Sequence, residues 1–295
     1  MMPALREPAE VVLAAGCELG EGPAWDDATG ELHWVDIPLG RLHRCDPVTG
    51  ATSYRAFAYE VSAVLPRTGG GLAVAARHGI LLLDPEGRTE ETVAVPGEPA
   101  GNRLGDAGVD PAGRLWFGTL DTEMLPGRGA LYRLDPGDRR PCRVLEATSV
   151  ANGIGWSPDG TRMYFVDSAT RRIDVLDYDP ATGAATGRRP WATVEDEAGV
   201  PDGLAVDAEG GVWVALWRGG QIRRYAPDGR HDTTLPLPVR QVTSCAFGGP
   251  GLSRLYATTG RVAMHGRQLA AEPDAGAVFA ADVGVPGLPV PRYAG

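Results

Sequence analysis

Residues 206–217 read VDAEGGVWVALW, a turn with Asp and Gly followed by a short apolar strand that contains aromatic residues. Four other segments share this pattern, and LPRTGGGLAVAA (65–76) is a weaker copy. Short apolar runs bounded by turn residues are typical of β-strands. The chain is therefore a repeat of strand-based units. The four other segments are WDDATGELHWVD (25–36), VDPAGRLWFGTLD (109–121), WSPDGTRMYFVDS (156–168) and FGGPGLSRLYATT (247–259).

The residues that open the six turns lie at near-constant intervals of 40, 44, 47, 50 and 41 positions. Periods of this length, with only strand-like segments between turns, are typical of β-propellers. Six copies predict one all-β domain over residues 1–295, a six-bladed β-propeller. A strand from EVVLAAG (10–16) would complete the last blade and close the ring. A β-sandwich would not need six copies at this spacing. The turn openers are Asp26, Pro66, Asp110, Ser157, Asp207 and Gly248.

Composition narrows the classes of partner. The chain has 295 residues and a net charge of −10, so it repels phosphate backbones and we expect no nucleic-acid partner. No stretch approaches the roughly 18 apolar residues of a membrane helix, and the first sixteen residues lack the features of a signal peptide. The four cysteines form no CxxC pair, and we expect free thiols, three or four of them buried. We therefore expect a cytoplasmic protein that does not enter membranes.

One position of the repeat carries a candidate metal site. The residues five positions before each turn opener would begin the innermost strand of each blade and face the central channel from one end. Three of them are oxygen donors, and two converging carboxylates repel each other unless a cation lies between them. Such ligands suit one divalent ion, Ca²⁺, Mg²⁺ or Mn²⁺, and Zn²⁺ also accepts carboxylates. The six residues are Glu21, Val61, Gly105, Asn152, Asp202 and Thr243, and the donors are Glu21, Asn152 and Asp202.

A plainer interpretation exists for one of these donors. Pro201-Asp202-Gly203 is a turn tripeptide that needs no function, and the chain uses SPDG (157–160) and APDG (226–229) as ordinary turns. For Asp202 alone, the turn would be the better interpretation. The shared repeat position with Glu21 and Asn152 favours the metal centre, with coordination positions left open for water and substrate.

Nearly the whole chain resembles the gluconolactonase, regucalcin and luciferin-regenerating-enzyme family of six-bladed propellers. The resemblance implies that Glu21, Asn152 and Asp202 bind a single divalent metal. It also implies substrate contacts from Arg103, Asp106 and Glu123. Gly105 stands where members that act on sugar lactones usually carry Asn, so we expect extra room beside it. The segments that carry the resemblance include LGEGPAWD (19–26), NRLGDAGVDPAGRLWFGTLD (102–121), ANGIGWSPDG (151–160) and PDGLAVDAEGGVWVA (201–215).

The resemblance further implies the hydrolysis of a lactone, a sugar lactone such as an aldonolactone, to its hydroxy acid. The metal would polarise the carbonyl, Asp202 would act as general base on the attacking water, and Arg103 would orient the small-molecule substrate. Two alternatives remain open. One is an esterase or phosphotriesterase activity on a non-sugar substrate, which Gly105 favours because a sugar-binding amide is absent. The other is a non-enzymatic metal-binding scaffold, which would not need three donors at one repeat position.

Overall fold

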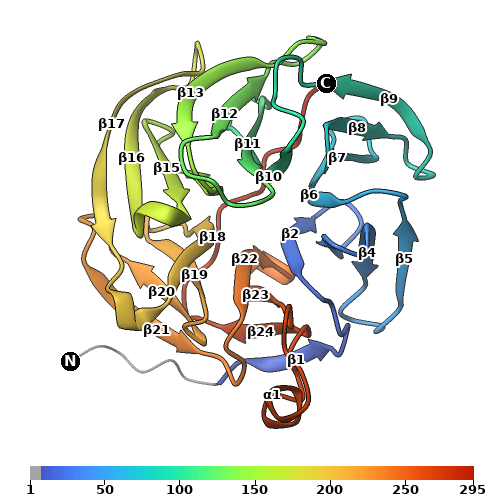
Figure 1. Cartoon of the computed structure of the whole chain (residues 1–295), viewed down its shortest axis with the longest axis vertical. Coiled ribbons are helices and arrows are strands. Elements are labelled where there is room, and N and C mark those ends of the chain that lie inside the picture. Colours follow the sequence, from blue (N-terminus) through green and yellow to red (C-terminus); the bar gives the residue numbers. More distant parts are fainter. Residues whose placement is uncertain (1–7) are drawn as a thin grey trace.

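The computed structural model describes residues 8–295, and across them the chain forms six four-stranded antiparallel sheets arranged in a ring (Figure 1). The predicted six-bladed β-propeller is confirmed. The first seven residues, part of the stretch searched for a signal peptide, lie outside the described residues.

The strands follow one another outward from the axis in blades one to five, and the sixth blade takes its outer strand from the N-terminal segment. Blades one to three contain β2 (Gly20–Asp26), β3 (Glu31–Asp36), β4 (Arg41–Cys45) and β5 (Thr52–Ala56); β6 (Val61–Pro66), β7 (Leu72–Ala76), β8 (Gly79–Leu83) and β9 (Thr89–Ala94); and β10 (Asn102–Val109), β11 (Leu115–Asp121), β12 (Gly129–Leu134) and β13 (Cys142–Thr148). Blades four to six contain β14 (Ala151–Trp156), β15 (Arg162–Asp167), β16 (Arg172–Asp179) and β17 (Ala184–Thr193); β18 (Val200–Val206), β19 (Val212–Trp217), β20 (Gln221–Tyr225) and β21 (His231–Pro236); and β22 (Val242–Gly248), β23 (Arg254–Thr259), β24 (Val278–Asp282) and β1 (Glu10–Leu13).

Helical structure is confined to connections. Within the described chain there is one α-helix, α1 (Arg267–Ala271), and no helix is long and apolar enough to cross a membrane. No disulfide joins the four cysteines in this part of the chain, and three of them are buried, as predicted. The short 3₁₀ turns are η1 (Ser168–Thr170), η2 (Asp196–Ala198) and η3 (Pro250–Leu252).

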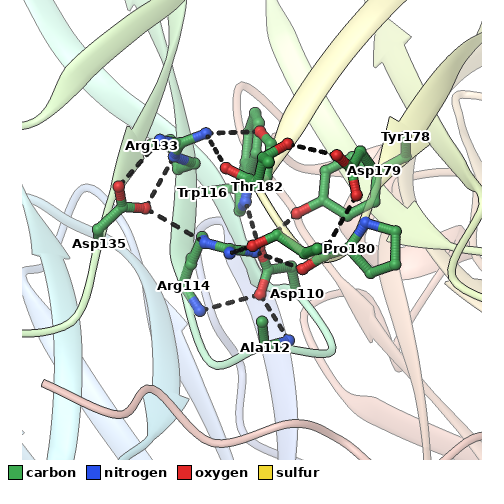
Figure 2. Close-up of polar contacts among 12 residues, drawn as sticks. Asp110, Ala112, Arg114, Trp116, Arg133, Asp135, Tyr178, Asp179, Pro180 and Thr182 are labelled. Atoms are coloured by element: carbon green, nitrogen blue, oxygen red, sulfur yellow. Dashed lines mark hydrogen bonds and ion pairs between the residues drawn. The ribbon is translucent and has the colours of Figure 1, made fainter.

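In two blades, the aspartate that opens the turn explains which residue types recur in the repeat. Asp110 is fully buried and accepts hydrogen bonds from the Ala112 N–H (2.8 Å), the Trp116 indole Nε1 (3.1 Å) and the Tyr178 hydroxyl of the next blade (Figure 2). A buried carboxylate is tolerated when such donors surround it. In blade three the pattern Asp-x-x-Gly-x-x-Trp therefore joins a turn, the second strand of its blade and, through Tyr178, the neighbouring blade.

The fifth blade repeats this arrangement. Asp207 is fully buried and accepts hydrogen bonds from the Gly211 N–H (2.8 Å), Trp213 Nε1 (2.8 Å) and Arg224 Nε (2.7 Å). The hydrogen bond from the indole to the aspartate is thus the same in blades three and five, whereas the third donor comes from the next blade in blade three and from the same blade in blade five.

The ring closes through its two ends. Strand β1 pairs antiparallel with β24, so the N-terminal segment supplies the outer strand of the sixth blade. This confirms the prediction for EVVLAAG. The first strands of neighbouring blades, β2, β6, β10, β14, β18 and β22, pack against one another around the axis and are called the inner strands below.

The C-terminal tail, residues 286–295, crosses the end of the channel at which the inner strands finish (Figure 1). Ala208 donates a backbone hydrogen bond to Pro286 of the tail (2.9 Å), and on the other side of the axis Thr68 donates one to Tyr293 (2.9 Å). The Tyr293 side chain is fully buried. The tail therefore links blades on opposite sides of the ring.

We predict that Asp207→Ala lowers the free energy of unfolding by about 3 kcal/mol, because it leaves the buried Trp213 indole and Arg224 guanidinium without their shared acceptor. Chemical denaturation monitored by tryptophan fluorescence measures the change. Asp46→Ala is the matched control, since Asp46 opens a turn at the surface and its hydrogen-bond partners Val48 and Thr49 are close in sequence. We expect less than about 1 kcal/mol there. Equal losses in the two variants would contradict the role of the buried carboxylate.

Candidate functional site

A cavity of about 530 Å³ opens at the end of the channel where the inner strands begin, opposite the C-terminal tail. Polar side chains from blades one to five form one part of its lining. The remaining wall is largely apolar. The polar residues are Glu21, Ser62, Arg103, Asp106, Asn152, Ser168, Arg171 and Asp202, and the apolar side chains include Leu19, Ile37, Leu120, Met124, Val150, Val200, Trp217 and Val262.

Four of the six predicted channel positions line this cavity: Glu21, Gly105, Asn152 and Asp202. The other two do not. Val61 packs in the core with other apolar side chains, and the Thr243 hydroxyl donates a hydrogen bond to the Gly20 carbonyl (2.6 Å). The repeat position therefore located the site, but the side chains at two of its six positions turn away from it.

Each inner strand contains one extra residue relative to its partner at the level of the site. The register shifts between Glu21 and Ala24 in β2, and equivalent shifts occur in the other five inner strands. Such β-bulges re-aim side chains and are common beside functional sites. The bulges thus help to set the direction of Glu21, Asn152 and Asp202.

Glycines follow these donors because the inner strands approach each other closely. A Cβ atom on Gly153 would lie 2.8 Å from the Asp202 carbonyl oxygen, and one on Gly203 would lie 2.0 Å from the Ser244 hydroxyl.

The expectation that Gly105 leaves extra room is wrong for the same reason. A Cβ atom there would lie 2.7 Å from the Ala151 carbonyl oxygen. The backbone of the neighbouring strand occupies the space into which a side chain at position 105 would point.

Asn152 lies between two other polar groups of the cavity. Its amide nitrogen donates to the Ser168 hydroxyl (3.1 Å) and to an Asp202 carboxylate oxygen. On the other side of the cavity the Glu21 carboxylate accepts a hydrogen bond from the Gly22 N–H (2.9 Å). A half-turn of the Asn152 amide would present an oxygen in place of the nitrogen beside Asp202.

Three carboxyl groups share the cavity with the guanidinium of Arg103, and their burial shapes its electrostatics. Burial and the nearby Asp106 raise the pKa of Glu21 to about 8, although the Gly22 N–H and Arg103 act in the opposite direction. Burial raises the pKa of Asp106 to about 6. Burial, then Glu21 and Asp106, raise the pKa of Asp202 well above its usual value. The site therefore favours binding of positive charge.

The donor set fits a divalent cation. Glu21, Asn152 and Asp202 offer carboxylate and amide oxygens, the ligands that Ca²⁺ and Mg²⁺ prefer, and Zn²⁺ and Mn²⁺ also accept them. Buried carboxylates without a matching charge are unfavourable, and a cation among them removes that cost. Two observations support the fit: Glu21 raises the pKa of Asp202, and the Asn152 amide contacts the Asp202 carboxylate.

Two predicted substrate-binding residues line the cavity and one does not. Arg103 and Asp106 belong to the lining, and Arg103 Nη1 also donates to the Leu104 carbonyl (2.8 Å). Glu123 is exposed on the loop after β11, outside the lining over residues 8–295. Its neighbour Met124 lines the cavity instead. A role for Glu123 stays a prediction.

The sequence reasoning missed several residues of the lining that come from connections. Ser168 and Arg171 lie on η1 and directly after it, and Arg171 adopts a left-handed backbone conformation (φ 55°). Its Nη2 donates to the Gly199 carbonyl (2.7 Å), which fixes it at the mouth of the cavity. Of these two residues, only Ser168 lies within a repeat segment of the sequence, as the last residue of WSPDGTRMYFVDS (156–168).

The fold and the cavity define a six-bladed propeller with an acidic polar site at one end of its channel. The chain belongs to the SMP-30/gluconolactonase/LRE-like family, whose profile matches residues 19–261. This confirms the resemblance indicated by the repeats.

The similarity extends over nearly the full length of individual relatives. Regucalcin of Oryctolagus cuniculus is 36% identical over 294 residues, with 97% of this chain and 98% of the relative covered. A solved calcium-binding regucalcin from Agrobacterium tumefaciens has a TM-score of 0.94 and 30% identity, with 99% of each chain covered. A luciferin-regenerating enzyme has a TM-score of 0.88 and 31% identity, with 97% of this chain and 99% of that chain covered.

We predict that the metal-free protein becomes less stable as the pH rises from about 4.5 to about 8. The folded-state pKa of Glu21 is raised above its usual value of 4.5, so its contribution to stability is fully present below pH 4.5 and is lost as the pH approaches 8. Thermal melting after chelator treatment measures this dependence. Glu21→Gln is the control, because it keeps the shape and cannot titrate. An unchanged pH dependence in that variant would contradict the assignment.

Proposed function

We propose that this protein is a metal-dependent hydrolase that opens a lactone to the corresponding hydroxy acid. The observation that carries the proposal is the convergence of Glu21, Asn152 and Asp202, from blades one, four and five, on one cavity. Membership of a family that includes gluconolactonase supports the reaction class. A scaffold protein would have no need to bury the carboxyl groups of Glu21, Asp106 and Asp202 in one cavity.

Glu21, Asn152 and Asp202 would hold one divalent cation, to which the Asn152 amide would contribute its oxygen rather than its nitrogen. The similar regucalcin from Agrobacterium tumefaciens is a calcium-binding protein, which favours Ca²⁺ among hard cations. When bound, the cation supplies Lewis-acid polarisation of the ester carbonyl.

Residues of the chain would carry out the proton transfers and orient the substrate. Asp202 accepts the proton of the attacking water as the water oxygen bonds to the carbonyl carbon. The ring C–O bond then breaks, and its oxygen takes the proton from Asp202 to become the hydroxyl of the product, which returns Asp202 to the carboxylate. Arg103 and Asp106 orient the substrate through hydrogen bonds, and the apolar wall keeps bulk water from the reacting atoms.

We expect Asp202→Ala to lower kcat/KM for lactones by about a thousandfold or more, since it removes a metal ligand and the general base together. A pH-drop assay measures turnover, and thermal melting checks the fold. Asp159→Ala is the matched control: Asp159 occupies the same Pro-Asp-Gly tripeptide, but it is exposed in the turn at the other end of an inner strand. Near-normal turnover in the Asp202 variant would refute the assignment.

The apolar wall supports a second candidate, hydrolysis of a non-sugar ester or lactone. A sugar lactone presents hydroxyls that need hydrogen-bond partners. In the apolar part of the lining, Ile37 and Val150 have no polar side-chain group, and Trp217 has only its indole N–H. An ester or lactone with an apolar substituent would place it against this wall and its carbonyl beside Asp202.

A panel of lactones distinguishes the two candidates. If the second holds, kcat/KM for γ-lactones should rise by about fourfold for each methylene added to the side chain, the value expected for burying one CH₂ group. Trp217→Ala should flatten this slope. A flat slope in the wild type, together with faster hydrolysis of an aldonolactone, would leave the sugar-lactone assignment in place.

A further inference from the structure

A second group of potential metal ligands lies in blade one, apart from the channel. Cys17, Asp36 and His43 are only 1%, 1% and 8% exposed, and one donor atom from each lies within 4.8 Å of the others. Cys17 belongs to the connection between β1 and β2, Asp36 ends β3 and His43 lies in β4. None of the three lines the cavity that contains Glu21 and Asp202.

The donors of this group retain free coordination capacity. Each oxygen of Asp36 accepts one backbone hydrogen bond, from Glu18 (3.0 Å) and Leu19 (3.2 Å), so lone pairs remain on both. The His43 ring stacks on Trp34 with 5.0 Å between centroids. Its buried Nε2 has no hydrogen-bond partner among residues 8–295. A buried ring nitrogen in this state calls for an unseen partner, because such groups are nearly always paired.

The propeller repeat does not itself require this combination. In blade four, Asp167 makes the same two backbone contacts as Asp36, with Ser149 (3.0 Å) and Val150 (2.9 Å). The position that corresponds to His43 in the strand pairing is Asp174, which Arg172 and Arg188 neutralise. Thr148 stands in place of Cys17. Blade four therefore makes the aspartate contacts without a thiol or an imidazole beside them, so these contacts do not themselves require the combination found in blade one.

We propose that Cys17, Asp36 and His43 form a second metal site, specific for Zn²⁺ or a cation of similar softness. A thiolate and an imidazole nitrogen select zinc over the hard cations that oxygen ligands favour in the channel. The thiol proton leaves on binding, so the thiolate and the carboxylate together balance the charge of the ion. Around tetrahedral zinc, ligand atoms stand roughly 3.5 Å apart, so the three groups need only a small contraction.

Such an ion would fasten the point at which the ring closes. Cys17 lies in the segment that leaves the last blade, and its N–H donates to the Gly276 carbonyl (2.9 Å). Asp36 and His43 belong to the first blade. An ion bound to all three would tie this segment to blade one beside the closure and would stabilise the folded state by mass action. This inference does not depend on the proposed lactonase activity.

The test uses the full chain, stripped with chelator and then loaded with Zn²⁺ or Co²⁺. We expect Cys17→Ser to bind one zinc ion fewer than the wild type and to lose the near-ultraviolet thiolate-to-cobalt charge-transfer band. Cys45→Ser, which removes a second buried thiol of the same blade, should retain both properties. Asp202→Ala should lose the channel ion and keep the thiolate band, so the two sites fail independently.

Equal zinc stoichiometry and an unchanged cobalt band in Cys17→Ser would overturn the proposal. If that variant does not fold, X-ray absorption on the zinc-loaded wild type decides the question. A sulfur scatterer at about 2.3 Å supports the site. A shell made only of oxygen and nitrogen refutes it.

Discussion

Closure of the ring is the constraint on which the site depends. Glu21, Asn152 and Asp202 come from three blades and are separated by up to 181 of the 295 residues, yet each lies near the start of an inner strand. They meet only because six sheets pack around one axis, and the antiparallel pairing of β1 with β24 holds that arrangement shut. The packing of β2 against β22 and the bridge between Leu19 and Gly260 close the same seam.

Much of this architecture was legible in the sequence because one buried group forces a pattern. A carboxylate such as Asp110 or Asp207 survives in the interior only with donors at fixed distances, so the glycine of the turn and the tryptophan six residues on recur with it. The full pattern occurs in blades three and five, and the other four blades share with them only the turn followed by a short apolar strand. The regular spacing of those turns predicts each blade and its inner strand. That is why the family, the fold and the place of Asn152 could all be predicted.

Side-chain direction was harder to predict, since it depends on backbone detail that the repeat does not encode. The bulge in every inner strand breaks the alternation of faces, so Val61 turns into the core while Asp106 turns into the cavity. Gly105 was misread because strand-to-strand spacing is invisible in a sequence. Loops such as the one bearing Glu123 and Met124 carry no period. The Cys17–His43 group joins segments with no shared pattern.

The C-terminal tail closes one end of the central channel. Because residues 286–295 span the ring from the fifth blade to the second, a molecule cannot thread through the propeller. Whatever occupies the cavity beside Arg171 must leave by the mouth through which it came. A molecule that leaves the cavity and the next one that arrives would therefore use the same opening. The tail therefore makes the cavity a pocket with one opening rather than part of a channel that runs through the ring.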